Sequence, residues 1–79
     1  MKARVTVTLK SGILDPQGKA IEGALASLGF TGVTGVRQGK VFDIGLTETD
    51  PAKARESLGR MCDTLLANLV IEDYTIDLT

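Results

Sequence analysis

The stretch KSGILDPQGKAIEGALASLG, residues 10–29, determines the order of the first structural elements. Asp15-Pro16 is typical of a helix start, because an aspartate N-cap accepts hydrogen bonds from free backbone N–H groups and proline suits the first helical position. The apolar residues that follow recur at the spacing of one helix face: Ile21, Ala24, Leu25 and Leu28. Gly29 is suited to the left-handed residue that ends a helix. We therefore expect a loop and then a helix that ends at Gly29.

The same helix start recurs 35 residues later, at Asp50-Pro51. Apolar residues again mark one face of the helix that follows: Ala54, Leu58, Met61, Cys62, Leu65 and Leu66. We expect this second helix to end near Asn68. The repeat indicates two similar halves within one domain that spans residues 1–79.

Alternating apolar and polar residues predict the strands. Val5, Val7 and Leu9 alternate with polar residues, and the same period of two recurs in residues 40–47 and 70–78. Residues 32–38 are interpreted as a further strand, joined to 40–47 by a hairpin turn in which Gly39 has a positive φ. The predicted order is β-α-β-β-α-β, an α+β ferredoxin-like sandwich with a four-stranded antiparallel sheet and two helices on one face.

Composition narrows the classes of partner. The chain has 79 residues, 43% of them hydrophobic, and a net charge of −1 with scattered basic residues, so no nucleic acid is expected. No apolar run approaches the roughly 20 residues that span a bilayer, so no membrane is expected either. A single cysteine, Cys62, fits a reducing compartment, and we expect a cytoplasmic location. Because a domain of this size has a thin core, association with other chains is the expected route to stability.

The sequence contains no evident catalytic group. Histidine is absent, and Cys62 lies on the apolar helix stripe, where an inert buried thiol is expected. No glycine pattern matches a phosphate-binding loop, and no metal site is expected. The loop at 10–18 could hold an anion at the helix start, but Asp15 would occupy that position as the cap. Chemistry alone therefore favours a non-catalytic binding or assembly module.

One sheet face is left open by the pattern. It would carry short polar and apolar side chains: Thr6, Thr8, Val41, Asp43, Thr75 and Asp77. This face could meet solvent or a second copy of the chain, and the patterning does not distinguish the two.

Three stretches carry a resemblance to a known family: LKSGILDPQGKAIEGAL (9–25), VRQGKVFDI (36–44) and MCDTLLANLVIEDY (61–74). Together they resemble PurS, the small subunit of phosphoribosylformylglycinamidine synthase. The likeness covers nearly the whole chain, and GILDPQGKAI is its most specific part. Leu69 departs from the family, which often has proline there, so the corner before the last strand is expected to be less rigid.

The resemblance implies a non-catalytic assembly subunit of an enzyme of de novo purine synthesis. It would join a glutaminase subunit to an ATP-dependent synthetase subunit, aid ammonia transfer between them, and form dimers or tetramers. It would bind no cofactor itself, since ATP and Mg²⁺ belong to the synthetase subunit. The alternative is a small-molecule-sensing regulatory domain of ferredoxin-like fold.

We assign two groups of residues on this basis. Asp15, Pro16, Asp50 and Pro51 are interpreted as structural caps. Gly18 at the third helical position has no local account, because glycine costs up to about 1 kcal/mol there relative to alanine. The candidates for the partner interface are Lys10, Gly12, Gln17, Gly18, Lys19, Arg37 and Lys40.

Overall fold

A computed structural model describes all residues, Met1–Thr79, and contains three strands and two α-helices. Their order along the chain is β1 (Lys2–Leu9), α1 (Pro16–Ser27), β2 (Gly39–Gly45), α2 (Pro51–Met61), the π-helical turn η1 (Cys62–Leu66) and β3 (Glu72–Leu78). The coarse α+β prediction is therefore confirmed. Neither helix has the length and apolar character needed to cross a membrane.

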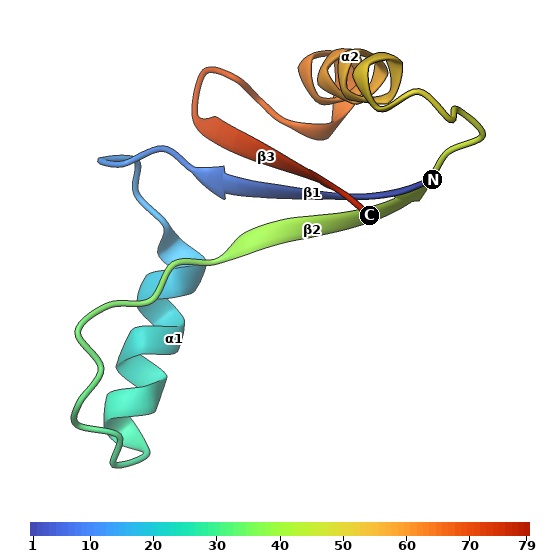
Figure 1. Cartoon of the computed structure of the whole chain (residues 1–79). Helices are drawn as coiled ribbons and strands as arrows, with labels where there is room; N and C mark the ends of the chain where they lie inside the picture. The colour runs from blue at the N-terminus through green and yellow to red at the C-terminus, as the bar shows by residue number, and fades with distance from the viewer.

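The sheet is antiparallel, with the strand order β2-β1-β3 (Figure 1). On one face Ala3, Val5 and Val7 of the central strand are buried, as their period of two predicts. They pack against Leu58 and Cys62, which lie on the predicted apolar stripe of the second helix. This cluster is the hydrophobic core of the chain.

The opposite face of the sheet has no helix over it (Figure 1). Arg4 lies level with Asp43 and Asp77, and its Nε donates a 2.9 Å hydrogen bond to Asp43 Oδ1. Val41, on the same face, is 57% exposed. The chain therefore buries its sheet on one side only.

The predicted fourth strand, residues 32–38, is not formed, and the sheet has three strands. Two glycines, Gly32 and Gly35, weaken the strand propensity of this segment. Its backbone is instead tied to the start of α1, where Gln38 N donates to Asp15 Oδ2 at 2.8 Å. The predicted hairpin turn is also wrong, because Gly39 opens β2 and does not have a positive φ.

Gly39 has a different reason to be glycine. A Cβ at this position would lie 2.5 Å from the carbonyl oxygen of Val7 on β1. Glycine at this position therefore lets the start of β2 approach the backbone of β1 closely. The two positive φ angles of the chain belong to Gly12 (86°) and Gly29 (96°).

α1 does not lie on the sheet, which contradicts the prediction of two helices on one face. It projects from one end of the sheet, while α2 covers the core face (Figure 1). The radius of gyration is 15.9 Å, against roughly 12 Å for a compact chain of this length. Residues expected to be buried in a sandwich are exposed, with Ile21 at 42% and Leu28 at 73%.

The ends of the helices follow the local signals. Asp15 and Asp50 cap α1 and α2 through 2.9 Å hydrogen bonds from Gly18 N and Ala52 N. At the other end of α1, Gly29 N donates to Ala26 O and Phe30 N donates to Leu25 O, the pattern of a Schellman motif. α1 is therefore a locally well-formed helix without a sheet to cover.

We expect Leu58→Ala to lower the free energy of unfolding by about 2–5 kcal/mol, because it opens a cavity in the one buried cluster. Leu65→Ala is the matched control. Leu65 is 82% exposed, so its truncation should change stability by no more than about 0.5 kcal/mol. Urea unfolding followed by circular dichroism measures both, and equal losses in the two variants would contradict this position of the core.

Candidate functional site

Two segments join α1 to the sheet, residues 10–15 on the way out and 36–39 on the way back; together we call them the neck. The part beyond, residues 16–35, is called the arm. Asp15 connects the two segments, because its Oδ1 accepts from Gly18 N at 2.9 Å and its Oδ2 accepts from Gln38 N at 2.8 Å. One carboxylate therefore caps α1 and fastens the returning chain.

These hydrogen bonds also set the ionisation of Asp15. The backbone N–H of Gln38, then that of Gly18, lowers the pKa of the Asp15 carboxyl below its usual 3.8, and the charge of Arg37 acts in the same direction. The carboxylate form that makes both bonds is thus the stable form at neutral pH.

Gly18, in the first turn of α1, is buried against the two segments of the neck, at Asp15 and Val36. A Cβ there would lie 2.4 Å from Asp15 Oδ2 and 2.6 Å from the carbonyl oxygen of Val36. Beside it, Gln38 Nε2 donates a 2.6 Å hydrogen bond to Gln17 Oε1. Local helix propensity does not explain glycine at position 18, but the close contacts with Asp15 and Val36 do.

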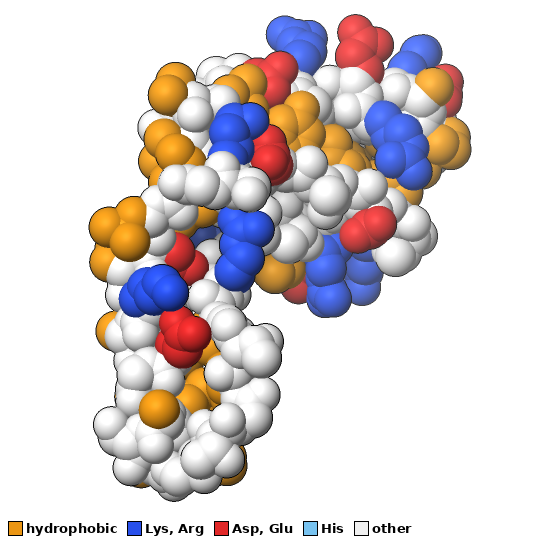
Figure 2. Space-filling view, turned by 90° about the vertical axis from the view of Figure 1, so that its left-hand side faces the viewer, with side chains coloured by type: hydrophobic (Ala, Val, Ile, Leu, Met, Phe, Trp, Pro, Cys, Tyr) orange, Lys and Arg blue, Asp and Glu red, His pale blue; other side chains and the backbone are white.

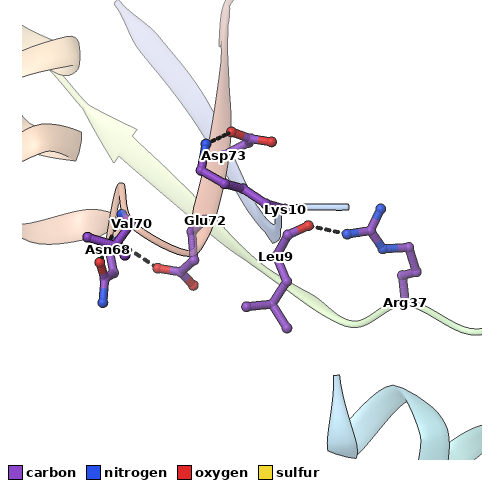
Figure 3. A network of polar contacts seen from close by, with 7 residues as sticks. All are labelled: Leu9, Lys10, Arg37, Asn68, Val70, Glu72 and Asp73. Carbon is purple, nitrogen blue, oxygen red and sulfur yellow. Dashed lines mark hydrogen bonds and ion pairs between the residues drawn. The ribbon is translucent and has the colours of Figure 1, made fainter. Parts of the chain in front are cut away.

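The base of the neck is held to the sheet by charged side chains (Figure 3). Lys10 Nζ lies 2.7 Å from Asp73 Oδ1 on β3, and the Arg37 guanidinium donates to the carbonyl oxygen of Leu9. An exposed ion pair such as Lys10–Asp73 contributes only about 0–1 kcal/mol, so it orients the neck more than it stabilises it.

A second set of contacts joins β2 to the corner before β3. Lys40 Nζ lies 3.6 Å from Glu72 Oε2. Glu72 Oε1 accepts from Asn68 N at 2.7 Å (Figure 3). Asn68 Oδ1 in turn accepts from Val70 N at 3.1 Å. The corner around Leu69 is therefore held by side-chain hydrogen bonds of Asn68 and Glu72.

The structure brings most of the predicted interface residues together. Those at or beside the neck are Lys10, Gly12, Gln17, Gly18, Arg37 and Lys40. Lys19 lies at the start of α1 and pairs with Glu22 at 3.3 Å. Charged side chains of both signs gather where the arm meets the sheet (Figure 2). An open groove of about 300 Å³ lies here, and Gln17, Gln38 and Lys40 contribute to its wall.

Sequence reasoning missed the second role of Asp15 and the whole role of Gln38. Gln38 ends the segment that the pattern predicts as a strand, and the carboxylate that its backbone N–H binds lies 23 residues away, at Asp15. No local period links positions so far apart. The one available signal was Gly18, whose missing side chain indicated a close backbone contact.

The buried side chains of the chain leave no polar atom unpaired. No three histidine, cysteine, aspartate or glutamate side chains are grouped to hold a metal ion. Cys62 is fully buried, and burial raises the pKa of its thiol, so the reactive thiolate is disfavoured.

The fold and the site define a small α+β protein with a braced neck and a projecting arm. The family model for PurS, phosphoribosylformylglycinamidine (FGAM) synthase, matches residues 2–79. The chain belongs to the PurS family, whose members are subunits of this glutamine-dependent ligase of purine biosynthesis.

Relatives and solved structures agree with this family. The FGAM synthase subunit PurS of Mycobacterium leprae is 51% identical and that of Synechocystis sp. 46%; the alignments cover 95% and 96% of this chain, and 91% and 76% of the relatives. The crystal structure of PurS from Methanocaldococcus jannaschii has a TM-score of 0.88 at 45% identity, covering 96% of this chain and 92% of that one. A chain in the structure of PurLQS from Thermotoga maritima has a TM-score of 0.89 at 30% identity, covering 96% and 93%.

We expect Gly18→Ala and Gly23→Ala to have opposite effects on α1. At Gly18 the new Cβ must displace backbone, a cost of about 1–3 kcal/mol that outweighs the gain of up to about 1 kcal/mol in helix propensity. At Gly23 nothing lies within 4 Å of the Cβ, so only the gain remains. Hydrogen exchange of the α1 amides should slow in Gly23→Ala and accelerate in Gly18→Ala, and equal behaviour would contradict the close contact with Val36.

The neck should also respond to acid. Because the folded-state pKa of Asp15 lies below its unfolded value, its contribution to stability is complete above the unfolded pKa and is lost as pH falls through the folded one. An NMR titration should place the Asp15 midpoint below 3.8, with the Gln38 amide signal moving at the same pH. Asp15→Ser, which can still cap α1, should remove that movement, and an Asp15 midpoint above 3.8 would contradict the two hydrogen bonds.

Proposed function

We propose that this chain is the assembly subunit that joins the glutaminase subunit of FGAM synthase to its ATP-dependent synthetase subunit, in the cytoplasm. The observation that carries this proposal is the arm, which the neck holds away from the sheet. A chain whose longest dimension is 48 Å presents well-separated surfaces to different partners. The Thermotoga maritima structure is named PurLQS, which supports a complex of several subunits.

The neck is the surface proposed to contact the synthetase subunit. Its candidate side chains combine amide and cationic groups with exposed positions: Lys10, Gln17, Lys19, Arg37 and Lys40. Their hydrogen bonds within the chain hold several of them in fixed positions before any partner binds. Preorganised side chains lose less entropy on association, which favours such a surface as an interface.

The contribution to ammonia transfer is proposed to be positional. ATP and Mg²⁺ are assigned to the synthetase subunit, and this chain binds no cofactor of its own. A rigid connector that fixes the distance and orientation of two active sites keeps a small diffusing intermediate close to its acceptor. The braced neck provides the rigidity that this role needs.

The chain is further proposed to act as a homo-oligomer, a dimer or a tetramer. Its accessible surface is 5630 Å², about 1,000 Å² more than a compact monomer of 8.4 kDa would have. Only seven of its 79 residues are buried, so much of the apolar surface is left for another chain to cover.

We expect the double variant Gln17→Ala/Lys19→Ala to fold normally and to bind the synthetase subunit at least about tenfold more weakly. Both side chains are exposed, so their loss should change the stability of the isolated chain by no more than about 0.5 kcal/mol. Lys53→Ala is the control, since Lys53 is an exposed lysine on α2, away from the neck.

The assay combines light scattering with glutamine-dependent activity in the presence of all three subunits, glutamine, ATP and Mg²⁺. Wild-type binding and ammonia-coupled activity in the double variant would remove Gln17 and Lys19 from the proposed interface. A ternary complex that forms and works equally well without this chain would overturn the proposal as a whole.

A further inference from the structure

Four exposed apolar side chains lie in two turns at one end of the sheet. Ile13 and Leu14 follow β1, and Leu69 and Val70 precede β3. Leu14 is 71% exposed and Val70 is 81% exposed, although turns are usually built from polar residues, glycine and proline. We call these four residues the corner patch.

The first turn is fixed by its own backbone. Ile13 N donates to Lys10 O at 3.1 Å, and Gly12 has the positive φ, 86°, that the third position of a type II turn requires. Nothing lies within 4 Å of a Cβ at Gly12, so the backbone angle alone explains the glycine. The turn therefore holds the backbone at Ile13 in one conformation.

The second turn is held by Asn68. Its carbonyl oxygen accepts from Ile71 N at 3.0 Å and from Glu72 N at 2.7 Å, and its Oδ1 accepts from Val70 N at 3.1 Å. Both turns lie at the same end of the sheet (Figure 1), and Lys10 N donates to Ile71 O at 2.8 Å, which joins their bases. The corner patch is thus carried on one ordered backbone.

The corner patch is continuous with the neck. Ile13 and Leu14 belong to the outgoing segment of the neck, residues 10–15, and the second turn is bonded to that segment at Lys10. Figure 2 faces this end of the molecule and shows apolar side chains gathered above the arm, next to charged side chains of both signs. An exposed apolar patch with a polar rim is typical of a surface that binds another protein.

The cations of the neck are poorly suited to supply most of the affinity for a partner. They are already engaged within the chain: Lys10 with Asp73, Lys40 with Glu72, and Arg37 with the carbonyl oxygen of Leu9. A new contact to a partner would replace a contact that exists, so the net gain is small. Apolar side chains in water have no such bond to lose, and their burial is favourable in proportion to the area removed from water.

We propose that the corner patch is the apolar centre of the surface that binds the synthetase subunit, with the polar side chains of the neck as its rim. The inference rests on the proposed function and names the side chains that carry most of the affinity. The complementary surface of the synthetase subunit is apolar and has little net charge, because the ion pairs Lys10–Asp73 and Lys40–Glu72 balance the charges around the patch.

A second copy of the chain is a less suitable occupant of the corner patch. The apolar residues of the arm form a separate set, with Leu28 at 73% and Phe30 at 58% exposed, and self-association has that surface available. The corner patch instead adjoins the polar side chains proposed for the synthetase contact, so a single partner can cover both.

The double variant Leu14→Ser/Val70→Ser tests the proposal. In surface plasmon resonance it should bind the synthetase subunit at least about 30-fold more weakly, because apolar residues at the centre of an interface carry much of its affinity. Leu65→Ser/Val41→Ser is the matched control, with the same two substitutions at positions outside the patch that are 82% and 57% exposed. Urea unfolding checks the fold of both, and each single variant carries the test where a double variant is unstable.

Salt separates the apolar centre of the surface from its polar rim. In about 1 M salt, where the screening length is about 3 Å, the binding deficit of Leu14→Ser/Val70→Ser should persist. The deficit of Gln17→Ala/Lys19→Ala, which includes the loss of a charge, should shrink under the same conditions.

Wild-type binding by Leu14→Ser/Val70→Ser, or an equal loss in the control variant, would overturn the proposal. A loss of self-association or of glutaminase binding with synthetase binding intact would also overturn it, because either result assigns the corner patch to another partner. The proposed function fails in a different way, since the wild-type chain itself would then be dispensable for the ternary complex.

Discussion

The carboxylate of Asp15 is the contact on which the shape of this chain depends. A helix N-cap needs one acceptor, and this side chain supplies two, one to Gly18 N and one to Gln38 N. The first bond starts α1, and the second fixes where the chain must return. Together with the glycine at position 18, they convert a flexible connection into a braced neck that holds the arm away from the sheet.

Holding the arm outward leaves the core thin. The sheet is buried on one face only, by one helix, and the core cluster centres on Val5, Val7 and Leu58. A chain with so little buried surface gains stability from any partner that binds its folded form. Association of the folded chain with a partner would therefore raise its stability, and the exposed apolar residues of the arm are available for such a contact.

The sequence pattern predicted the elements whose signals are local. The alternation from Arg4 to Leu9 and the two Asp-Pro helix starts appear where expected. The apolar stripe of the second helix is confirmed except at Leu65, which is 82% exposed, because α2 ends at Met61 and the chain continues as the π-helical turn η1. The predicted position of α1 was wrong. An apolar stripe indicates that a helix packs against an apolar surface, but it does not indicate where that surface lies. The strand expected at 32–38 failed for a related reason: its backbone is bonded to Asp15, a partner too distant in sequence for any local period to reveal.

The candidate site was predictable as a set of residues and not as an arrangement. Lys10, Arg37 and Lys40 were singled out for their charge, yet each is engaged within the chain by an anion or a carbonyl oxygen. The comparison of the two helix caps shows what distinguishes the neck. Asp50 uses one oxygen to cap α2, a task that serine or asparagine performs about as well. At Asp15 the second oxygen has a partner of its own, so only a side chain with two acceptor atoms at the right separation can both begin the arm and fix its direction. For a subunit whose proposed contribution is geometric, that constraint links the residue type at one position to the function of the whole chain.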